Sequence, residues 1–267
     1  MNAVADSPAG PHRPLWRASG SLALLALAAC ALLLALLRAH PQLDLAAAAP
    51  FFQAAPCVAP VNETANARIC GTFPLETDAT AQGWRMMAYR LIQSAGLASF
   101  MWLLYVALVP PANGAARAAR LTRALLPPLA LLAGPVLLVN VVLKAFWGRP
   151  RPYQTDLFGG TAPFALPGTV SDGCTSNCSF VSGEVSSAAW FIAFVPMVPR
   201  GWRIPFAAAV AVFTVTVSYG RIAFGRHYLS DAVMAAALTL AVIAAIGWIL
   251  QRPAVQERLA AVRSSAR

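Results

Sequence analysis

Polar residues that could carry out a reaction lie in three short segments of an otherwise apolar chain. The first segment offers two cations, the second a serine, a glycine and a carboxylate, and the third an arginine, a histidine and an aspartate. In order, they are Lys144 and Arg151, then Ser182, Gly183 and Glu184, then Arg221, His227 and Asp231.

His227 and Asp231 are four residues apart, so on a helix they share one face. The Asp231 carboxylate is then expected to accept a hydrogen bond from Nδ1–H of His227 and to leave Nε2 free to attack an electrophile. An isolated pair with this spacing is more often a helix cap or an interfacial pair. A catalytic role for this pair is therefore expected only if cations that can bind a substrate lie near it.

A phosphate group is bound by cations and N–H donors aimed at its oxygens, most strongly as charge spreads in the transition state. Lys144, Arg151 and Arg221 supply the charges. Ser182 adds a hydroxyl donor, and Gly183 permits close approach of the backbone at the start of a predicted helix. These residue types together predict a phosphate site.

The elements that position these residues are predicted to be membrane helices. Of 267 residues, 58% are hydrophobic and only 11% are charged, with a mean hydropathy of +0.62, whereas about a quarter of a soluble domain is charged. A bilayer span needs about 20 apolar residues. Six segments qualify, and the fold class is an all-α bundle of six transmembrane helices: 19–38, 88–109, 122–143, 183–199, 204–220 and 230–250.

Arginines determine the predicted topology. With six spans, four arginine-rich places fall on one side, which the positive-inside rule makes cytoplasmic, together with both termini. The basic balance of +10 thus reflects membrane orientation, and no nucleic-acid partner is expected. All three chemical segments fall at the outer, periplasmic helix ends. The cytoplasmic arginines are Arg13 and Arg17, then Arg117, Arg120 and Arg123, then Arg200 and Arg203, then Arg252, Arg258, Arg263 and Arg267.

Four of the five cysteines fall in the outer loops, where an oxidising compartment favours disulfides. Pairing within each loop predicts Cys57–Cys70 and Cys174–Cys178, because the alternatives would bridge separate loops. Zinc binding is the competing interpretation of the Cys174 and Cys178 spacing.

The chain divides into three parts. Residues 1–84 hold an N-terminal tail, the first span and a long periplasmic loop. Residues 85–250 form the helical core with the three segments, and residues 251–267 form a basic cytoplasmic tail that we expect to be helical.

At this point the pattern resembles a known family. Lys144-x6-Arg151-Pro152, then Ser182-Gly183, then Arg221-x5-His227-x3-Asp231 is similar to the three-part signature of the type 2 phosphatidic acid phosphatase (PAP2) superfamily. The resemblance covers roughly residues 85–250. It implies a metal-independent membrane lipid phosphatase without cofactors.

Residue roles follow from the resemblance. Lys144, Arg151, Arg221, Ser182 and the Gly183 N–H would bind the substrate phosphate. His227 would form a phosphohistidine, and Asp231 would orient it.

Two positions depart from the family pattern. Gly220 replaces a serine before the arginine of the third part, and Glu184 replaces the histidine that protonates the leaving group. Nearby cations and a helix start favour a charged Glu184, which cannot donate a proton, whereas desolvation favours the acid. Glu184 as general acid, and as base for the attacking water, is one hypothesis. The other is that Glu184 pairs with Arg149 or Arg226 and that water supplies the proton.

Arg149 and Arg226 lie beside the motif positions and are expected to be interfacial anchors, with contact to a second phosphate or a sugar as the alternative. Other functions stay open: a lipid-phosphate phosphotransferase, a catalytically silent lipid-phosphate binder, and more remotely an intramembrane serine protease using Ser182 and His227.

The expected substrate is a phosphomonoester or pyrophosphate of a lipid. Phosphatidic acid, phosphatidylglycerol phosphate, polyprenyl pyrophosphate and lipid A are the alternatives, and the glutamate variant favours lipid A weakly. Besides this lipid and the membrane itself, no protein partner is predicted. The expected location is a bacterial inner membrane.

Overall fold

The computed structural model describes residues 20–57, 70–109 and 111–262, and these residues form helices without a named strand. Arg13, Arg17, Arg263 and Arg267, which entered the topology argument, lie outside the described residues. The α-helices are α1 (Gly20–Ala39), α2 (Gln42–Ala48), α3 (Ala79–Leu108), α4 (Gly114–Leu131), α5 (Lys144–Phe146), α6 (Gly183–Ala189), α7 (Arg203–Ala223), α8 (Leu229–Leu250) and α9 (Pro253–Ala261).

Five helices are long and apolar enough to cross a bilayer. They correspond to five of the six expected spans, and three of them are clearly longer than the apolar runs alone indicate. The five are Gly20–Ala39, Ala79–Leu108, Gly114–Phe146, Arg200–Ala223 and Leu229–Leu250.

The remaining expected span, 183–199, is divided between α6 and the 3₁₀ segment η6 (Trp190–Met197). Pro196 lies inside η6, and Val198 leaves it in an extended conformation. A second 3₁₀ turn, η7 (Arg200–Trp202), then leads directly into α7. This segment is therefore shorter and less regular than its hydropathy indicates.

The third span is continuous from α4 through the π-helical segment η3 (Leu132–Leu143) to α5. Proline lacks the N–H that an α-helix needs and clashes with the preceding turn. Around Pro135 the wider π winding accommodates this defect. Asn140 donates from Nδ2 to the Pro135 carbonyl at 2.7 Å, so a polar side chain stabilises the irregular turn.

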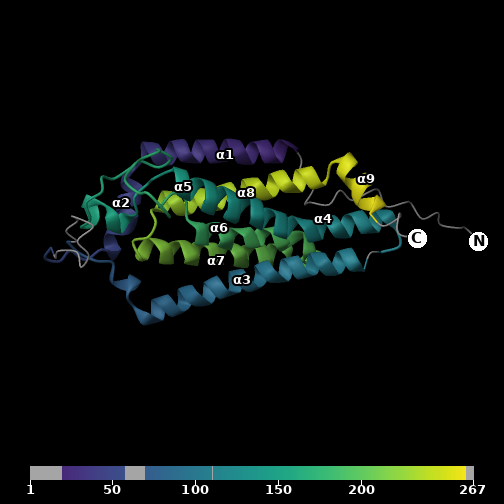
Figure 1. Cartoon of the computed structure of the whole chain (residues 1–267), viewed down its shortest axis with the longest axis horizontal. Coiled ribbons are helices and arrows are strands. Elements are labelled where there is room, and N and C mark those ends of the chain that lie inside the picture. The colour runs from purple at the N-terminus through teal and green to yellow at the C-terminus, as the bar shows by residue number, and fades with distance from the viewer. Residues whose placement is uncertain (1–19, 58–69, 110, 263–267) are drawn as a thin grey trace, which may run out of the picture.

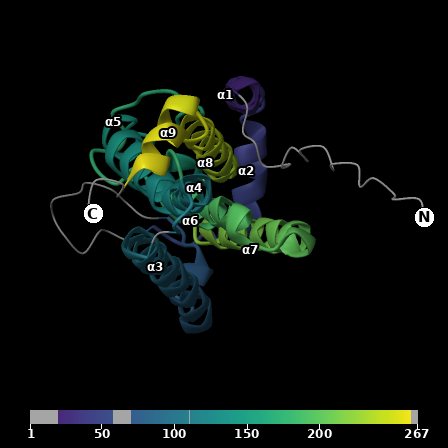
Figure 2. The ribbon, with the colours of Figure 1, turned by 90° about the vertical axis from the view of Figure 1, so that its right-hand side faces the viewer.

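Helix α8 lies inside the bundle and contacts α1, α4, α6 and α7. Small residues such as Ala232, Ala235 and Ala241 are buried on it and let its neighbours approach. Helix α3 lies at the edge of the bundle and slopes away from α7 toward the end that carries α2 and α5 (Figures 1 and 2).

The two ends of the bundle differ. Helix α1 begins and α9 ends at one end, whereas α2 and α5 lie at the other (Figure 1). At the first end Arg117 donates from Nη1 to the Ala260 carbonyl at 3.1 Å and so holds α9 against α4. The helical tail predicted after residue 251 is thus present as α9.

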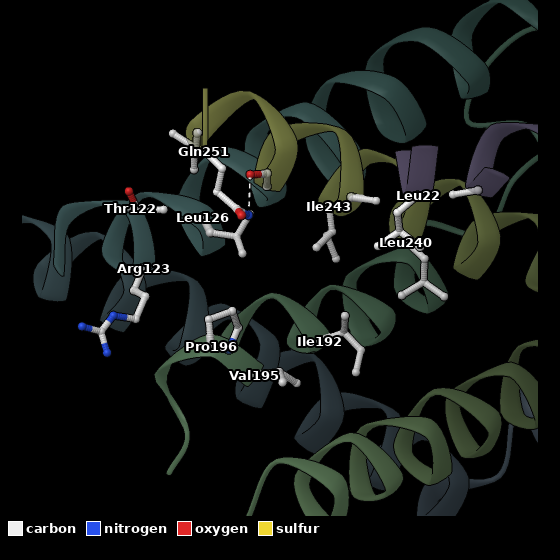
Figure 3. Close-up of a pocket in the computed structure, with 14 residues that line it drawn as sticks. Leu22, Thr122, Arg123, Leu126, Ile192, Val195, Pro196, Leu240, Ile243 and Gln251 are labelled. Carbon is white, nitrogen blue, oxygen red and sulfur yellow. Dashed lines mark hydrogen bonds between the residues drawn. The ribbon is translucent and has the colours of Figure 1, made fainter. Parts of the chain in front are cut away.

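A cavity of about 330 Å³ lies between α1, α4, η6 and α8. Figure 3 shows Leu22, Leu126, Ile192 and Ile243 around it, with Arg123 turned away to one side. None of the residues of the three chemical segments lines it.

Candidate active site

The turn between α7 and α8 places His227. Backbone N–H groups of Arg226 and His227 both donate to the Arg221 carbonyl, at 3.1 and 3.3 Å. Gly225 adopts φ +62°, and a Cβ there would lie 2.3 Å from the Phe73 ring, so only glycine fits. The tight turn brings Arg221 and His227 to the same place.

The His227 imidazole is buried, with 2% of its surface exposed. Its Nδ1 lies 2.8 Å from the Ser179 carbonyl. A carbonyl oxygen can only accept, so Nδ1 carries the proton and Nε2 keeps its lone pair. This is the tautomer a histidine nucleophile requires.

Asp231 lies close to His227 but does not accept the expected hydrogen bond. The distance from its Oδ2 to His227 Nδ1 is 3.8 Å, which is too long. Ser179 lies between them: its carbonyl accepts from His227, and its Oγ donates to Asp231 Oδ2 at 2.5 Å. The predicted pair is thus brought together, with a serine as the intermediary.

Burial, together with the nearby Arg221 and Lys144, lowers the pKa of His227 to about 4 against the opposing effect of Asp231. The imidazole is therefore neutral at physiological pH. A neutral ring with a free Nε2 can act as a nucleophile without first losing a proton.

The Asp231 carboxylate is fully buried and accepts three hydrogen bonds. They come from Arg149 Nη1 at 2.6 Å, Ser179 Oγ at 2.5 Å and the Tyr228 N–H at 2.9 Å. The last closes the first turn of α8, where a carboxylate is favourable. Asp231 is thereby fixed on every side.

Arg149 is fully buried, which corrects its interpretation as an interfacial anchor. It donates to Asp231 and, from Nη2 at 2.8 Å, to Asp44 of α2. Asp44 also accepts from the N–H and the hydroxyl of Ser230, at 2.7 and 2.6 Å. Burial alone would lower the pKa of Arg149, but Asp231 and Asp44 raise it above its usual value.

Lys144 and Arg151 converge on one residue, Asn177. Lys144 donates from Nζ to Asn177 Oδ1 at 3.1 Å, and Arg151 from Nη2 to the Asn177 carbonyl at 2.7 Å. Burial, together with the nearby Arg226, lowers the pKa of Arg151. Asn177 has φ +48° and lies inside the loop closed by Cys174 and Cys178.

Arg221 is 5% exposed, and within the described part of the chain its Nε and Nη1 have no hydrogen-bond partner. Its nearest anion is Glu184, with 3.3 Å from Nη1 to Oε1. Buried guanidinium N–H groups without acceptors are expensive. A bound anion would satisfy them.

Ser182 and Gly183 begin α6, as expected. Ser182 Oγ accepts from the Val185 N–H at 3.5 Å, and the Ser182 N–H donates to the Asp231 carbonyl at 3.2 Å. A Cβ on Gly183 would lie 2.6 Å from Asn140 Oδ1, so a larger residue would displace the Asn140 side chain from its bond to Pro135. The Ser182 hydroxyl is thus used as a helix cap, which weakens the serine protease alternative.

Glu184 pairs with Arg85 of α3, whose Nη2 lies 2.9 Å and Nε 3.1 Å from Oε1, as well as with Arg221. The proposed pairing with Arg149 or Arg226 is therefore wrong. Arg226 instead donates to Glu76 at 2.5 Å. Arg85 lies far from the motifs in sequence, and nothing in its local pattern singles it out.

Several residues of the site were missed from sequence. Ser179 and Asn177 adjoin Cys178, and their proximity to the second motif could have drawn attention. Asp44 is an acidic residue in a long apolar stretch, which is a signal for function or pairing.

Both predicted disulfides are present. Cys57 pairs with Cys70 and Cys174 pairs with Cys178, while Cys30 is free and buried in α1. The disulfide between Cys174 and Cys178 contradicts the alternative that these two cysteines bind zinc. The described residues contain no group of three or more His, Cys, Asp or Glu side chains that could hold a metal ion.

In this all-helical chain with long apolar helices, a buried neutral histidine lies close enough to Arg221 and Lys144 to feel their charge, and such a group could accept a phosphoryl group. A model of the PAP2 superfamily matches residues 124–254. The chain belongs to this superfamily and is a membrane lipid phosphatase.

Curated relatives agree with this family. The chain is 41% identical over 214 residues to a lipid A 4′-phosphatase of Rhizobium leguminosarum, covering 80% of this chain and 90% of that protein. It is 40% identical over 215 residues to one of Rhizobium etli, with 80% and 81% covered. A Francisella tularensis subsp. novicida lipid A 4′-phosphatase is 40% identical over 105 residues, with 39% and 47% covered. No solved structure matches the chain significantly.

Proposed function

We propose that this phosphatase removes the 4′-phosphate of lipid A at the periplasmic face of a bacterial inner membrane. Two relatives bearing that activity in their names are about 40% identical over most of their length. The cation cluster suits a phosphomonoester dianion, and α3 and α7 present apolar surface beside it. Phosphatidic acid, phosphatidylglycerol phosphate and polyprenyl pyrophosphate become comparison substrates.

His227 is the nucleophile in this proposal. Its Nε2 forms a bond to phosphorus while the bond from phosphorus to the sugar oxygen breaks. The leaving oxygen takes up one proton. Water then attacks the phosphohistidine, releases inorganic phosphate and restores the neutral imidazole. Lys144, Arg151 and Arg221 offset the charge on the phosphoryl oxygens.

The single observation that carries the proposal is the state of Arg221. Among the described residues, Nε and Nη1 of Arg221 are buried and have no hydrogen-bond acceptor, and Arg221 begins the turn that places His227. A phosphoryl group in contact with Arg221 supplies the missing acceptors.

Glu184 is charged while it pairs with Arg85 and Arg221. To donate a proton it must lose part of this pairing. A substrate phosphate that binds Arg221 would weaken the pairing of Glu184 with Arg221, because the two anions compete for one guanidinium. We therefore keep Glu184 as the proposed proton donor to the sugar oxygen and as base for water.

The proposed topology has six spans, with α6 and η6 together as the fourth. Arginines at the end that carries α9, among them Arg117, Arg120 and Arg252, support a cytoplasmic location for that end. The two disulfides lie in the loops of the opposite end and support an oxidising compartment there.

The test is phosphate release in detergent with EDTA present, from lipid A and the three comparison lipids, for the native chain and His227→Ala. Release from lipid A that disappears in the variant supports the proposal. Preference for another lipid would overturn the substrate. Transfer of labelled phosphate to an added lipid or sugar acceptor would identify a phosphotransferase. If the folded protein turned over none of these lipids, it would be a silent binder.

A further inference from the structure

An apolar groove of about 750 Å³ runs between α3 and α7. Its walls carry Trp84, Met87 and Leu91 from α3 and Val212 and Phe213 from α7. The side chains of Trp84, Met87 and Val212 are more than half exposed. Both helices are long and apolar enough to span a bilayer, so a groove between them can be reached by lipid chains.

The groove ends on the candidate active site. Arg85, Glu184 and Arg221 line it alongside the apolar residues. Arg221 has N–H groups that no described residue accepts from, and Glu184 is its nearest described anion. A molecule lying in the groove would therefore have an apolar body and an anionic head.

Arg85 connects the groove to the site. It reaches from α3 to Glu184 of α6 through Nη2 and Nε, and its Nη1 donates to Gln82 at 3.3 Å. Helix α3 lies at the edge of the bundle and slopes away from α7 toward this end (Figure 1). The ion pair thus joins α3 to α6 at the end of the groove that meets the candidate site.

We infer that the groove between α3 and α7 receives an acyl chain of the lipid whose phosphate occupies the site, and that Arg85 is a positioning residue acting through Glu184. The inference rests on the proposed function. An apolar groove that opens toward lipid and ends at cations matches a lipid phosphate and does not match a water-soluble ester.

Arg85 has a defined task in this arrangement. A phosphate that binds Arg221 competes with the Glu184 carboxylate, because both anions are attracted to the same guanidinium. Glu184 stays within reach only if another cation holds it, and Arg85 does so from the groove side. Without Arg85, Glu184 would lose its place near the leaving oxygen.

Arg85→Gln tests this role, with Arg85→Lys as the conservative variant and Arg90→Gln, an exposed arginine of the same helix, as the matched control. We expect Arg85→Gln to lower kcat on lipid A by about ten- to a hundredfold through misplacement of Glu184. Arg85→Lys should retain part of the native kcat, and Arg90→Gln should have the same kcat as the native chain. In a Glu184→Gln background, Arg85→Gln should lower kcat no further; additive losses would overturn an action through Glu184.

The groove is tested separately by filling it. Ala88 lines the groove on α3, and Ala98 is exposed on the same helix away from it. Ala88→Phe should raise KM for lipid A about tenfold and leave KM for nitrophenyl phosphate unchanged. Ala98→Phe should change neither. Equal effects of the two variants would overturn the groove assignment.

A binding measurement keeps this test independent of turnover. Dodecyl phosphate with a diazirine at its chain end is photolysed with the His227→Ala protein, and labelled residues are mapped by mass spectrometry. Label on residues 84–91 and 209–217 supports the groove, whereas label elsewhere, or label not displaced by lipid A, overturns it. If the native chain hydrolyses no lipid, the proposed function is wrong. The photolabelling experiment still tests whether the groove binds an alkyl chain.

Discussion

Arg149 and Asp231 form a fully buried ion pair, 2.6 Å from Nη1 to Oδ1, in which neither side chain is exposed. The pair extends through Nη2 of Arg149 to Asp44, which stands in the short helix α2. One arginine thus joins the loop after α5, the start of α8 and the region before α3. Asp231, which is proposed to orient His227, is thus itself held by an arginine that also binds Asp44 of α2.

Removal of Arg149 should therefore be severely destabilising. Arg149→Met leaves two buried carboxylates without their cation, which lowers the free energy of unfolding by about 3–5 kcal/mol. Thermal unfolding in detergent measures the loss. Arg90→Met, at an exposed position, is the control and should change stability by less than about 0.5 kcal/mol. Similar unfolding temperatures for both variants would contradict the buried network.

The pH dependence of the reaction should report His227. Because burial lowers its pKa to about 4, kcat at saturating lipid phosphate, which does not report ionisation of the free substrate, should stay level from neutral pH downward. It should fall as the pH passes through about 4, where Nε2 becomes protonated. A decline centred near pH 6.5, the usual histidine range, would show that the imidazole is not desolvated.

Stability should follow the same group. Between pH 6.5 and 4 the unfolded His227 binds a proton that the folded one refuses, so its contribution to stability is full above 6.5 and is lost as the pH falls. Unfolding at pH 7 and pH 5 should differ less in His227→Gln than in the native chain. An identical pH slope in the two proteins would contradict this.

Glu184→Gln should separate acid catalysis from simple pairing. A proton donor matters most for a poor leaving group, so kcat on a sugar phosphate should fall by about 10²–10⁴-fold. Turnover of nitrophenyl phosphate, whose leaving group needs no proton, should fall much less. Full turnover of the sugar phosphate across the pH range would exclude Glu184 as the acid.

The Cys174–Cys178 disulfide should support phosphate binding more than global stability. Its two cysteines are only four positions apart in the sequence, so the disulfide reduces the entropy of the unfolded chain only slightly. That loop holds Asn177, which contacts Lys144 and Arg151.

Cys174→Ser with Cys178→Ser is therefore expected to raise KM severalfold with little change in unfolding temperature. Cys57→Ser with Cys70→Ser, which leaves Asn177 untouched, is the matched control. If the control pair raised KM as much, the specific role of the Asn177 loop would be wrong.

Local information was enough for much of this protein. The apolar runs located the spans because a bilayer imposes a minimum length on every helix. His227 and Asp231 were recognisable from their spacing, and the three motifs from their resemblance to a family. Pairing within each outer loop predicted both disulfides, since the cysteines of each pair are near in sequence.

The sequence failed where contacts are long-range. Asp44 and Arg149 are separated by 105 positions, and Arg85 and Glu184 by 99. No periodicity or motif links such residues, so the sequence predicts an interfacial anchor at Arg149, and one of the two hypotheses for Glu184 names partners that it does not contact. Residues 183–199 were also expected to be one regular helix, whereas Pro196 and packing divide them into α6 and η6.

By itself the sequence determined the all-helical class of fold and the residues that we propose bind and attack a phosphate, because these depend on hydropathy and on spacing within single elements. Only the tertiary structure decided which charges meet. A buried charge is stable only with a partner. The partners of Arg149, Asp231 and Glu184 depend on how α2, α3, α6 and α8 pack. That packing joins residues far apart in the chain, so local sequence does not reveal it.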